Sequence, residues 1–340
     1  NIVDCKTKIK LVHEIFFTVF ALIVNVLKVI VLGYAVLKSN LSVGAVVTVI
    51  SLLGKAYEPI AIFNVEYVDY KLNKITVNKY IELLDIKDDD ALDNGFKLKK
   101  LNGNIEFKNV SFSYNNKNII NNISFKINKN SSIALVGESG SGKSTIIKLI
   151  MGLIKYDEGN ILIDDKELSE LNLNIFYDNV TYISQEAPIF DGTLRENLIF
   201  DKKISDEKIK KVLSLVCLDK FYGKLEDGLD TELGEKGIRM SGGERQRVAL
   251  ARLFFDDSKI IILDEATSAM DNITEKLVMK NVVKQLNNKT LIVIAHRLET
   301  IKDVDKIYVL SDGIIQEEGN YNELLDKNGY FKNLYKTAKS

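Results

Sequence analysis

Residues 137–145 read Gly137-Glu138-Ser139-Gly140-Ser141-Gly142-Lys143-Ser144-Thr145, and this stretch decides the fold of the chain. The run just before it, 132–136, is short and mostly apolar, as a buried strand is. The glycines let backbone N–H groups close around phosphate oxygens, and a helix that begins near Lys143 would add its positive N-terminus. A strand, a Gly-rich loop ending in Lys-Ser and a helix together predict a nucleotide-binding α/β domain.

The side chains of this loop have separate predicted roles. Lys143 would supply a positive charge to the β- and γ-phosphates, and the Ser144 hydroxyl would be a ligand of Mg²⁺. The whole loop is predicted to contact the nucleotide, through Gly137, Glu138, Ser139, Gly140, Ser141, Gly142, Lys143, Ser144 and Thr145. A Gly-rich turn without a ligand is the alternative, and the full spacing of the motif disfavours it.

A second apolar run, residues 259–263, ends in two carboxylates, Asp264 and Glu265. Paired acids at the end of a parallel-type strand can simply cap a helix. With a phosphate loop upstream, however, Asp264 fits a ligand that holds Mg²⁺ through water, and Glu265 fits a general base that polarises the attacking water.

A third segment, Ser241-Gly242-Gly243, is predicted to open a helix, with Ser241 as its N-cap. The exposed N–H groups at such a helix start can bind an anion. Because the nucleotide of this chain is already expected at the phosphate loop, the sequence leaves open whose anion this helix would bind.

The first 65 residues differ from the rest because they are strongly apolar. Lys28 is the only charged residue from 15 to 37, and 41–53 contains none. Each stretch can supply the roughly 20 apolar residues that cross a bilayer, and the three-residue connection Lys38-Ser39-Asn40 makes them an antiparallel hairpin. Lysines before the first stretch and after the second place both ends in the cytoplasm by the positive-inside rule. A buried hairpin of a large soluble protein is the alternative.

Polar residues interrupt the apolar region at two places. Lys28 lies in the middle of the first predicted span, where it could line a substrate pathway, pair with a neighbouring helix or extend toward the interface. Lys55 and Glu58 are three residues apart, so they share a helix face and are expected to pair. Pro59 follows and can kink the second helix.

The overall composition excludes some classes of function. The chain has 340 residues, 46 Lys and Arg against 47 Asp and Glu, and a net charge of -1, which argues against a nucleic-acid-binding surface. Its two cysteines, Cys5 and Cys217, lack the spacing of a metal site or a disulfide framework and indicate a reducing compartment. The chain begins with Asn and is interpreted as the C-terminal part of a longer protein.

Taken together, the phosphate loop, the Ser-Gly-Gly segment and the Asp-Glu strand end resemble the ATP-binding cassette (ABC) ATPases, and the fused apolar stretch is similar to an ABC exporter. The resemblance implies an α/β P-loop NTPase cassette, with a RecA-like core, a helical subdomain and an antiparallel β-subdomain, preceded by an all-α transmembrane hairpin. Residues 1–84 would hold the last two transmembrane helices and their cytoplasmic extension, 85–101 a linker, and 102–340 the cassette.

The resemblance also implies roles for single residues. Tyr114 would stack on adenine, Gln185 would reach Mg²⁺ and the attacking water, and His296 would hold the γ-phosphate and the water. Asp271 would lie in a loop that crosses a dimer interface. The Ser-Gly-Gly segment would bind the γ-phosphate of an ATP held by the opposite cassette, through Ser241, Gly242 and Gly243.

Three residues depart from the usual family pattern. Glu244 stands where Gln is commonest, and its charge near phosphates is unfavourable, so it is expected to point away. Met240 and Met270 stand where Leu is usual.

The function expected from the resemblance is that of the ATP-binding and ATP-hydrolysing half of an ABC exporter, with ATP and Mg²⁺ as cofactors. Its partners would be a second half-transporter, identical or different, the lipid bilayer and an exported substrate, with no nucleic acid. The location would be a bacterial cell membrane, multi-pass, with the cassette on the cytoplasmic side. Drug, lipid and peptide export all remain open.

Three other classes compete with this hypothesis. A soluble ABC-type ATPase acting on nucleic acid or ribosomes shares the motifs but lacks fused apolar spans and favours a basic surface. The ATPase subunit of an importer is normally a separate soluble chain, and a P-loop kinase lacks the Ser-Gly-Gly segment.

Overall fold

The computed structural model describes residues 2–37, 42–85, 92, 94–98, 100–115, 117–234, 240–295 and 297–337. It divides into two units, Asn1–Asp88 and Asp89–Ser340.

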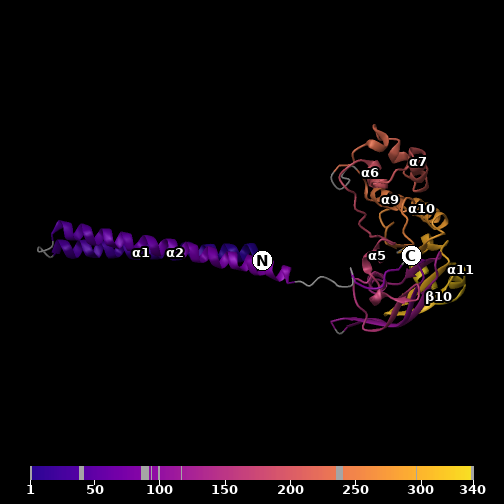
Figure 1. Ribbon diagram of the computed structural model, residues 1–340, viewed down its shortest axis with the longest axis horizontal. Coiled ribbons are helices and arrows are strands. Elements are labelled where there is room, and N and C mark those ends of the chain that lie inside the picture. The colour runs from indigo at the N-terminus through magenta and orange to yellow at the C-terminus, as the bar shows by residue number, and fades with distance from the viewer. Residues whose placement is uncertain are drawn as a thin grey trace. The chain divides into compact units, whose positions relative to one another are not determined.

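The first unit consists of two long helices, α1 (Ile2–Leu37) and α2 (Val43–Leu84), which lie side by side (Figure 1). Ser42 caps α2 because its side chain accepts a hydrogen bond from the N–H of Ala45 at 3.2 Å. The half-buried positions of α1 recur every three or four residues and mark the face that packs on α2: Phe17, Phe20, Ala21, Val24, Lys28, Val31 and Ala35. Lys28 therefore lies on the helix–helix seam.

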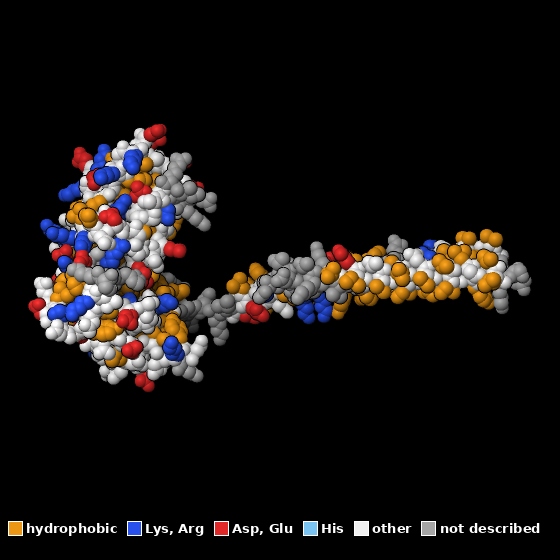
Figure 2. Space-filling model, turned by 180° about the vertical axis from the view of Figure 1, so that it is seen from behind, with side chains coloured by type: hydrophobic (Ala, Val, Ile, Leu, Met, Phe, Trp, Pro, Cys, Tyr) orange, Lys and Arg blue, Asp and Glu red, His pale blue; other side chains and the backbone are white. Residues whose placement is uncertain are grey.

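The outer surface of this hairpin is largely apolar, except along the C-terminal part of α2, where charged side chains are exposed (Figure 2). Among the described residues, Glu14–Leu37 is a 24-residue segment long and apolar enough to cross a membrane, whereas the apolar segment of α2 is the shorter Val43–Ala56. The side chains of residues 57 and 58 lie outside the described ones, so the second predicted span, which continues beyond Ala56, stays a prediction. The expected pairing of Lys55 with Glu58 lies outside the described residues, because the Glu58 side chain is not among them.

The second unit contains a small antiparallel sheet with the strand order β2-β1-β4-β5. Its strands are β1 (Ile105–Tyr114), β2 (Lys117–Ile127), β4 (Glu158–Ile163) and β5 (Lys166–Glu167). The long hairpin of β1 and β2 alternates buried and exposed residues, because one face packs on the core while the other meets solvent.

The larger sheet has six strands in the order β10-β9-β3-β8-β7-β6. Its bounds are β3 (Ser132–Val136), β6 (Val180–Ile183), β7 (Ile260–Asp264), β8 (Thr290–Ile294), β9 (Lys306–Ser311) and β10 (Ile314–Gly319). All pairs are parallel except β9 with β10, and β3, β7 and β8 are almost wholly buried, as strands covered on both faces are.

Helices and short turns complete the second unit. Their bounds are α4 (Lys143–Ile150), α5 (Leu173–Tyr177), α6 (Leu194–Ile199), α7 (Asp206–Leu215), α8 (Asp219–Tyr222), α9 (Gly242–Arg252), α10 (Asn272–Gln285), α11 (Tyr321–Asp326), α12 (Tyr330–Thr337), and the 3₁₀ turns η1 (Leu168–Glu170), η2 (Gly228–Asp230) and η4 (Leu298–Ile301).

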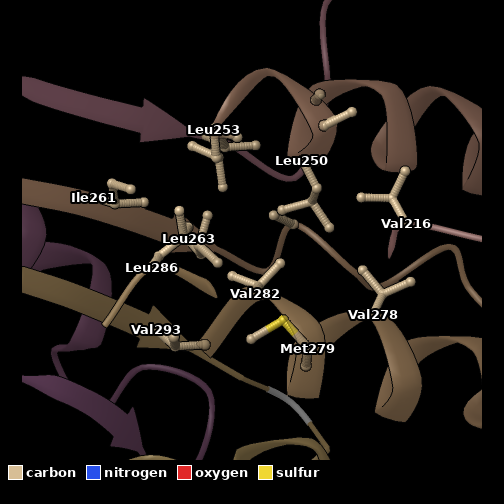
Figure 3. Packing of buried hydrophobic residues seen from close by; sticks show 14 of the residues in the cluster. Val216, Leu250, Leu253, Ile261, Leu263, Val278, Met279, Val282, Leu286 and Val293 are labelled. Atoms are coloured by element: carbon tan, nitrogen blue, oxygen red, sulfur yellow. The ribbon is translucent and has the colours of Figure 1, made fainter. Parts of the chain in front are cut away.

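Two hydrophobic cores lie on opposite faces of the larger sheet. Along β7, Ile260 and Ile262 belong to the core shared with the small sheet and α4, whereas Ile261 and Leu263 belong to the core under α6, α7, α9 and α10 (Figure 3). This alternation follows from the two-residue period of a strand. The two sheets and the helical region confirm the predicted fold class of the cassette.

The chain is already attached to this unit before β1. Phe96 donates its N–H to the carbonyl of Glu170 at 2.7 Å and accepts from the N–H of Asn172 at 3.2 Å, and Leu101 is buried. Part of the region predicted as a linker, 85–101, therefore packs on the cassette.

Candidate functional site

The carboxyl ends of β3, β8, β7 and β6 share one edge of the larger sheet, because all four strands run parallel. This edge is where ligands bind in open α/β sheets. β3 leads into the loop at 137–145, β7 ends at Asp264, and β6 ends two residues before Gln185. β8, which lies between β3 and β7, ends at Ile294, two residues before His296. His296 itself lies outside the described residues.

The loop after β3 needs glycine at defined positions. Gly137 has φ 153°, and a Cβ there would lie 2.2 Å from the carbonyl oxygen of Leu310. Gly142 has φ 104°, and a Cβ there would lie 2.6 Å from the Cδ1 of Ile120. Both distances are far below van der Waals contact, so the loop is held close to its neighbours in a conformation that excludes side chains.

Lys143 is buried beneath this loop. Its Nζ donates to the carbonyl oxygens of Gly137 and Glu138 at 2.8 and 2.7 Å. Burial lowers the pKa of Lys143, while the negative charges of Glu265 and Asp264 act in the opposite direction. The ammonium group thus lies between the phosphate loop and the two carboxylates that end β7.

A cavity of about 280 Å³ opens beside Lys143. Its lining residues are Tyr114, Ile119, Ser139, Gly140, Gly142, Lys143, Ser144, Thr145 and Glu265. The structure thereby brings the predicted base-stacking residue, most of the predicted phosphate loop and the predicted general base into one cavity. Tyr114 is 41% exposed, and its ring packs edge-on against Phe112 with 4.6 Å between centroids, which is a suitable platform for a base.

The backbone at Glu265 adopts an unusual conformation. Its φ is 53°, in the left-handed region that non-glycine residues rarely adopt, and its N–H donates to the carbonyl of Ile294 at 3.1 Å. Beside it, Asp264 accepts a hydrogen bond from the hydroxyl of Tyr182 at 3.0 Å. Burial and the Asp264 charge raise the pKa of Tyr182 to about 12, so this hydroxyl stays a hydrogen-bond donor at neutral pH.

Gln185 is not among the residues that line this cavity. It lines a separate groove of about 950 Å³, together with Gly242, Gln246, Ser268 and Ala269. The structure therefore does not bring Gln185 into the cavity that holds Lys143 and Glu265.

The start of α9 is capped as the sequence predicts. The side chain of Ser241 accepts from the N–H of Glu244, and the Glu244 carboxylate accepts from the N–H and the hydroxyl of Ser241 at 2.8 Å each, which forms a capping box. The sequence signal for it, Ser-x-x-Glu at 241–244, was available but was not used in the prediction. Glu244 therefore folds back onto the helix start, and Ser241, Gly242 and Gly243 do not line the cavity beside Lys143.

Asp271 lies at the start of α10. Its exposed side chain accepts from the N–H groups of Ile273 and Thr274 at 3.2 and 3.0 Å, and these hydrogen bonds lower the pKa of the Asp271 carboxyl. In this structure the residue is a helix cap and does not line the nucleotide cavity.

Sequence patterns did not predict an ion pair near these loops, between a buried carboxylate and a half-exposed guanidinium. Glu275 is 3% exposed, bonds to the hydroxyl of Thr267 at 2.7 Å and forms an ion pair with Arg297. Arg297 also donates to the carbonyl of Met270 at 2.8 Å. Arg297 is more than 20 positions away in the sequence from both Met270 and Glu275. Contacts between such distant residues leave no local pattern, so the sequence has no signal for this network.

A second groove, of about 530 Å³, is built around Arg252. The guanidinium lies over the rings of Phe190 and Phe200, which are both half exposed, and donates to the carbonyl oxygens of Asn197 and Pro188 at 2.7 and 2.8 Å. Burial lowers the pKa of Arg252 to about 10, which leaves it charged at neutral pH.

The fold and the cavity together define a P-loop nucleotide-binding cassette. Residues 120–268 match the family model described as ABC transporter. Residues 120–268 therefore form a domain of the ABC transporter family, the family's ATP-binding domain.

Relatives of known name agree with this assignment. An ATP-dependent lipid A-core flippase of Photorhabdus laumondii is 40% identical over 77% of this chain and 45% of its own length. A protein of Rickettsia conorii, named as a candidate export ATP-binding/permease protein, is 32% identical over 98% of this chain and 59% of its own. A solved structure of a bacterial Atm1-family ABC exporter with ATP bound superposes with a TM-score of 0.69 at 30% identity, covering 94% of this chain and 57% of that one. The chain thus spans about half the length of the relatives it matches.

The first prediction concerns the ion pair at Glu275. The change Glu275→Gln should lower the free energy of unfolding by about 2 kcal/mol, because the buried side chain of residue 275 loses its charge-assisted hydrogen bond to Arg297. The change Glu318→Gln breaks an exposed pair with Lys306 and should cost less than about 1 kcal/mol. Urea unfolding of both variants measures the difference, and equal losses would contradict a special role for the buried pair.

Proposed function

We propose that this chain is the ATP-binding and ATP-hydrolysing half of an ABC exporter. Residues 1–84 would be its last two transmembrane helices, 85–101 the linker and 102–340 the cassette. The observation that carries the proposal is the cavity in which Tyr114, the phosphate loop and Glu265 meet. The apolar α1 and the names of the relatives support export over a soluble ATPase acting on nucleic acid or ribosomes.

The residues present fit Mg²⁺ together with ATP. Ser144 lines the cavity beside Lys143, and Asp264 lies close enough to affect the pKa of Lys143, so both offer hard oxygen ligands. Mg²⁺ is usually held by one or two protein oxygens together with the phosphates. When bound, the ion would neutralise the phosphate charge that develops during transfer.

Hydrolysis would follow from the positions of the side chains around this cavity. Tyr114 would stack on adenine, Lys143 would leave its loop carbonyls for the β- and γ-phosphate oxygens, and Glu265 would take the proton of the attacking water. Gln185 would enter only after a closing movement, since it now lines a different groove. His296 would hold the γ-phosphate from its place after β8.

A second cassette would complete the site. At the start of α9, away from the chain's own cavity, Ser241 is exposed and Gly242 is half-buried, so this helix start would meet the γ-phosphate held by the partner. Asp271 would lie at the same interface. The partner would be a second half-transporter, identical or different.

Coupling to the membrane would use the groove around Arg252. Its exposed Phe190 and Phe200 fit the apolar face of a cytoplasmic segment that connects membrane-spanning helices. The protein would be multi-pass in a bacterial cell membrane with the cassette in the cytoplasm, as the lysines around the predicted spans favour. The substrate would be a drug, lipid or peptide, and the named flippase relatives favour a lipid.

The second prediction tests the reaction itself. The protein reconstituted in lipid vesicles should hydrolyse ATP in an Mg²⁺-dependent way, and Glu265→Gln should lower kcat by at least about 100-fold while ATP binding is kept. Phosphate release and nucleotide binding measure the two effects. Turnover that survives Glu265→Gln would place the catalytic base elsewhere.

The third prediction concerns Glu244. The change Glu244→Gln keeps a capping box but removes a negative charge from the helix start that would face the partner's γ-phosphate. It should lower the KM for ATP by about threefold to tenfold.

A matched control exists in the capping box of α6, where Thr193 and Glu196 make the same contacts. The change Glu196→Gln should leave the KM unchanged. An unchanged or raised KM in Glu244→Gln would show that α9 does not meet a phosphate.

A further inference from the structure

Gln246 is a buried polar side chain that the predicted reaction does not use. It lies on α9 and is only 3% exposed, although it carries an uncharged amide with two donors and an acceptor. Buried polar groups of this kind are costly unless each is hydrogen-bonded, so its partners show what the residue holds.

The amide of Gln246 joins three segments. Its Oε1 accepts from the N–H of Ala269 at 2.9 Å, and its Nε2 donates to the carbonyl of Gln185 at 3.1 Å and to the hydroxyl oxygen of Ser268 at 3.2 Å. Because the backbone N–H of Ala269 can only donate, the orientation of the amide is fixed. Both N–H donors and the carbonyl oxygen of the side chain are thereby hydrogen-bonded.

A second residue on the same face of α9, Gly243, also lies close to Ala269. Gly243 lies three residues before Gln246, on one helix face, and a Cβ there would lie 2.9 Å from the carbonyl oxygen of Ala269. Glycine at 243 therefore permits the close approach, and Gln246 supplies the hydrogen bond that fixes it. The turn at 268–269 also bonds to the catalytic region, since the N–H of Ser268 donates to the carbonyl of Glu265 at 3.1 Å.

We propose that Gln246 is a positioning residue for ATP hydrolysis: its amide fixes the backbone of Gln185 and the turn after Glu265 to α9. The three segments then move together when the start of α9 meets the partner's nucleotide. Closure would thus carry Gln185 from its groove toward the cavity at a defined position. The inference rests on the proposed ATP hydrolysis and assigns Gln246 no contact with ATP.

The test uses Gln246→Glu in the protein reconstituted in vesicles. The new carboxylate can still accept the hydrogen bond from the N–H of Ala269. It has no N–H donors for the carbonyl of Gln185 and the hydroxyl of Ser268, and its charge faces that carbonyl. We therefore expect kcat to fall by about tenfold or more. The KM for ATP should rise by less than kcat falls, because the cavity around Lys143 is untouched and the added charge is farther from the α9 start than that of Glu244. The matched control is Gln285→Glu, the same change at an exposed position at the end of α10, which should alter neither constant.

A double-mutant cycle separates positioning from a general structural role. In a Gln185→Ala background, the effect of Gln246→Glu on kcat should become clearly smaller, because one of the two segments being positioned has lost its functional side chain. An equal loss in both backgrounds, an unchanged kcat, or a parallel loss of ATP binding would overturn the proposal. If Gln246→Glu does not fold, Gln246→Asn, whose neutral amide is one methylene too short, replaces it with the same expected outcomes.

The two proposals fail in distinguishable ways. Wild-type protein that does not turn over ATP would contradict the proposed function. Wild-type turnover with Gln246→Glu indistinguishable from Gln285→Glu would contradict only the positioning role.

Discussion

The parallel pairing of β3, β8, β7 and β6 is the constraint on which the rest of the site depends. Parallel strands deliver their carboxyl ends to one edge, so four loops that are distant in sequence meet there. Lys143 and Glu265 reach the same cavity only because β8 alone separates their strands. The close approach of Gly137 to the carbonyl oxygen of Leu310 on β9 then fixes the position of the phosphate loop at that edge.

Around this edge, the loops are held by a few buried polar side chains rather than by further strands. Gln246 holds the segments at Gln185 and Ala269, and the ion pair of Glu275 with Arg297 holds the chain after β8 to α10. Gln246 and Glu275 are both buried and hydrogen-bonded, and a buried polar group that loses its partner is costly. Loops held in this way can shift as units, which a site completed by a second cassette would require.

Local patterns in the sequence were sufficient for much of this arrangement. The phosphate loop, the strand ending in Asp264 and the helix start at Ser241 each follow from residues close together in the chain, and the structure has β3, β7 and α9 at those places. Hydropathy also predicted two membrane spans, and the described residues contain one full-length candidate, Glu14–Leu37. The second span stays a prediction, because the side chains at 57 and 58 lie outside the described residues.

The remainder could not be predicted because it depends on tertiary contacts. Gln246 lies 61 residues from its partner Gln185, and no spacing rule joins them. The left-handed backbone at Glu265 likewise follows from the bond of its N–H to Ile294 on the neighbouring strand. Such contacts become visible only when the sheet order is known.

The most direct test of the account is a structure of the full-length Glu265→Gln protein with Mg²⁺ and ATP bound in lipid. The account predicts that the γ-phosphate lies between Lys143 of one cassette and the α9 start, at Ser241, of a second. ATP contacted by one cassette alone, with the α9 start still open to solvent in a closed complex, would contradict it.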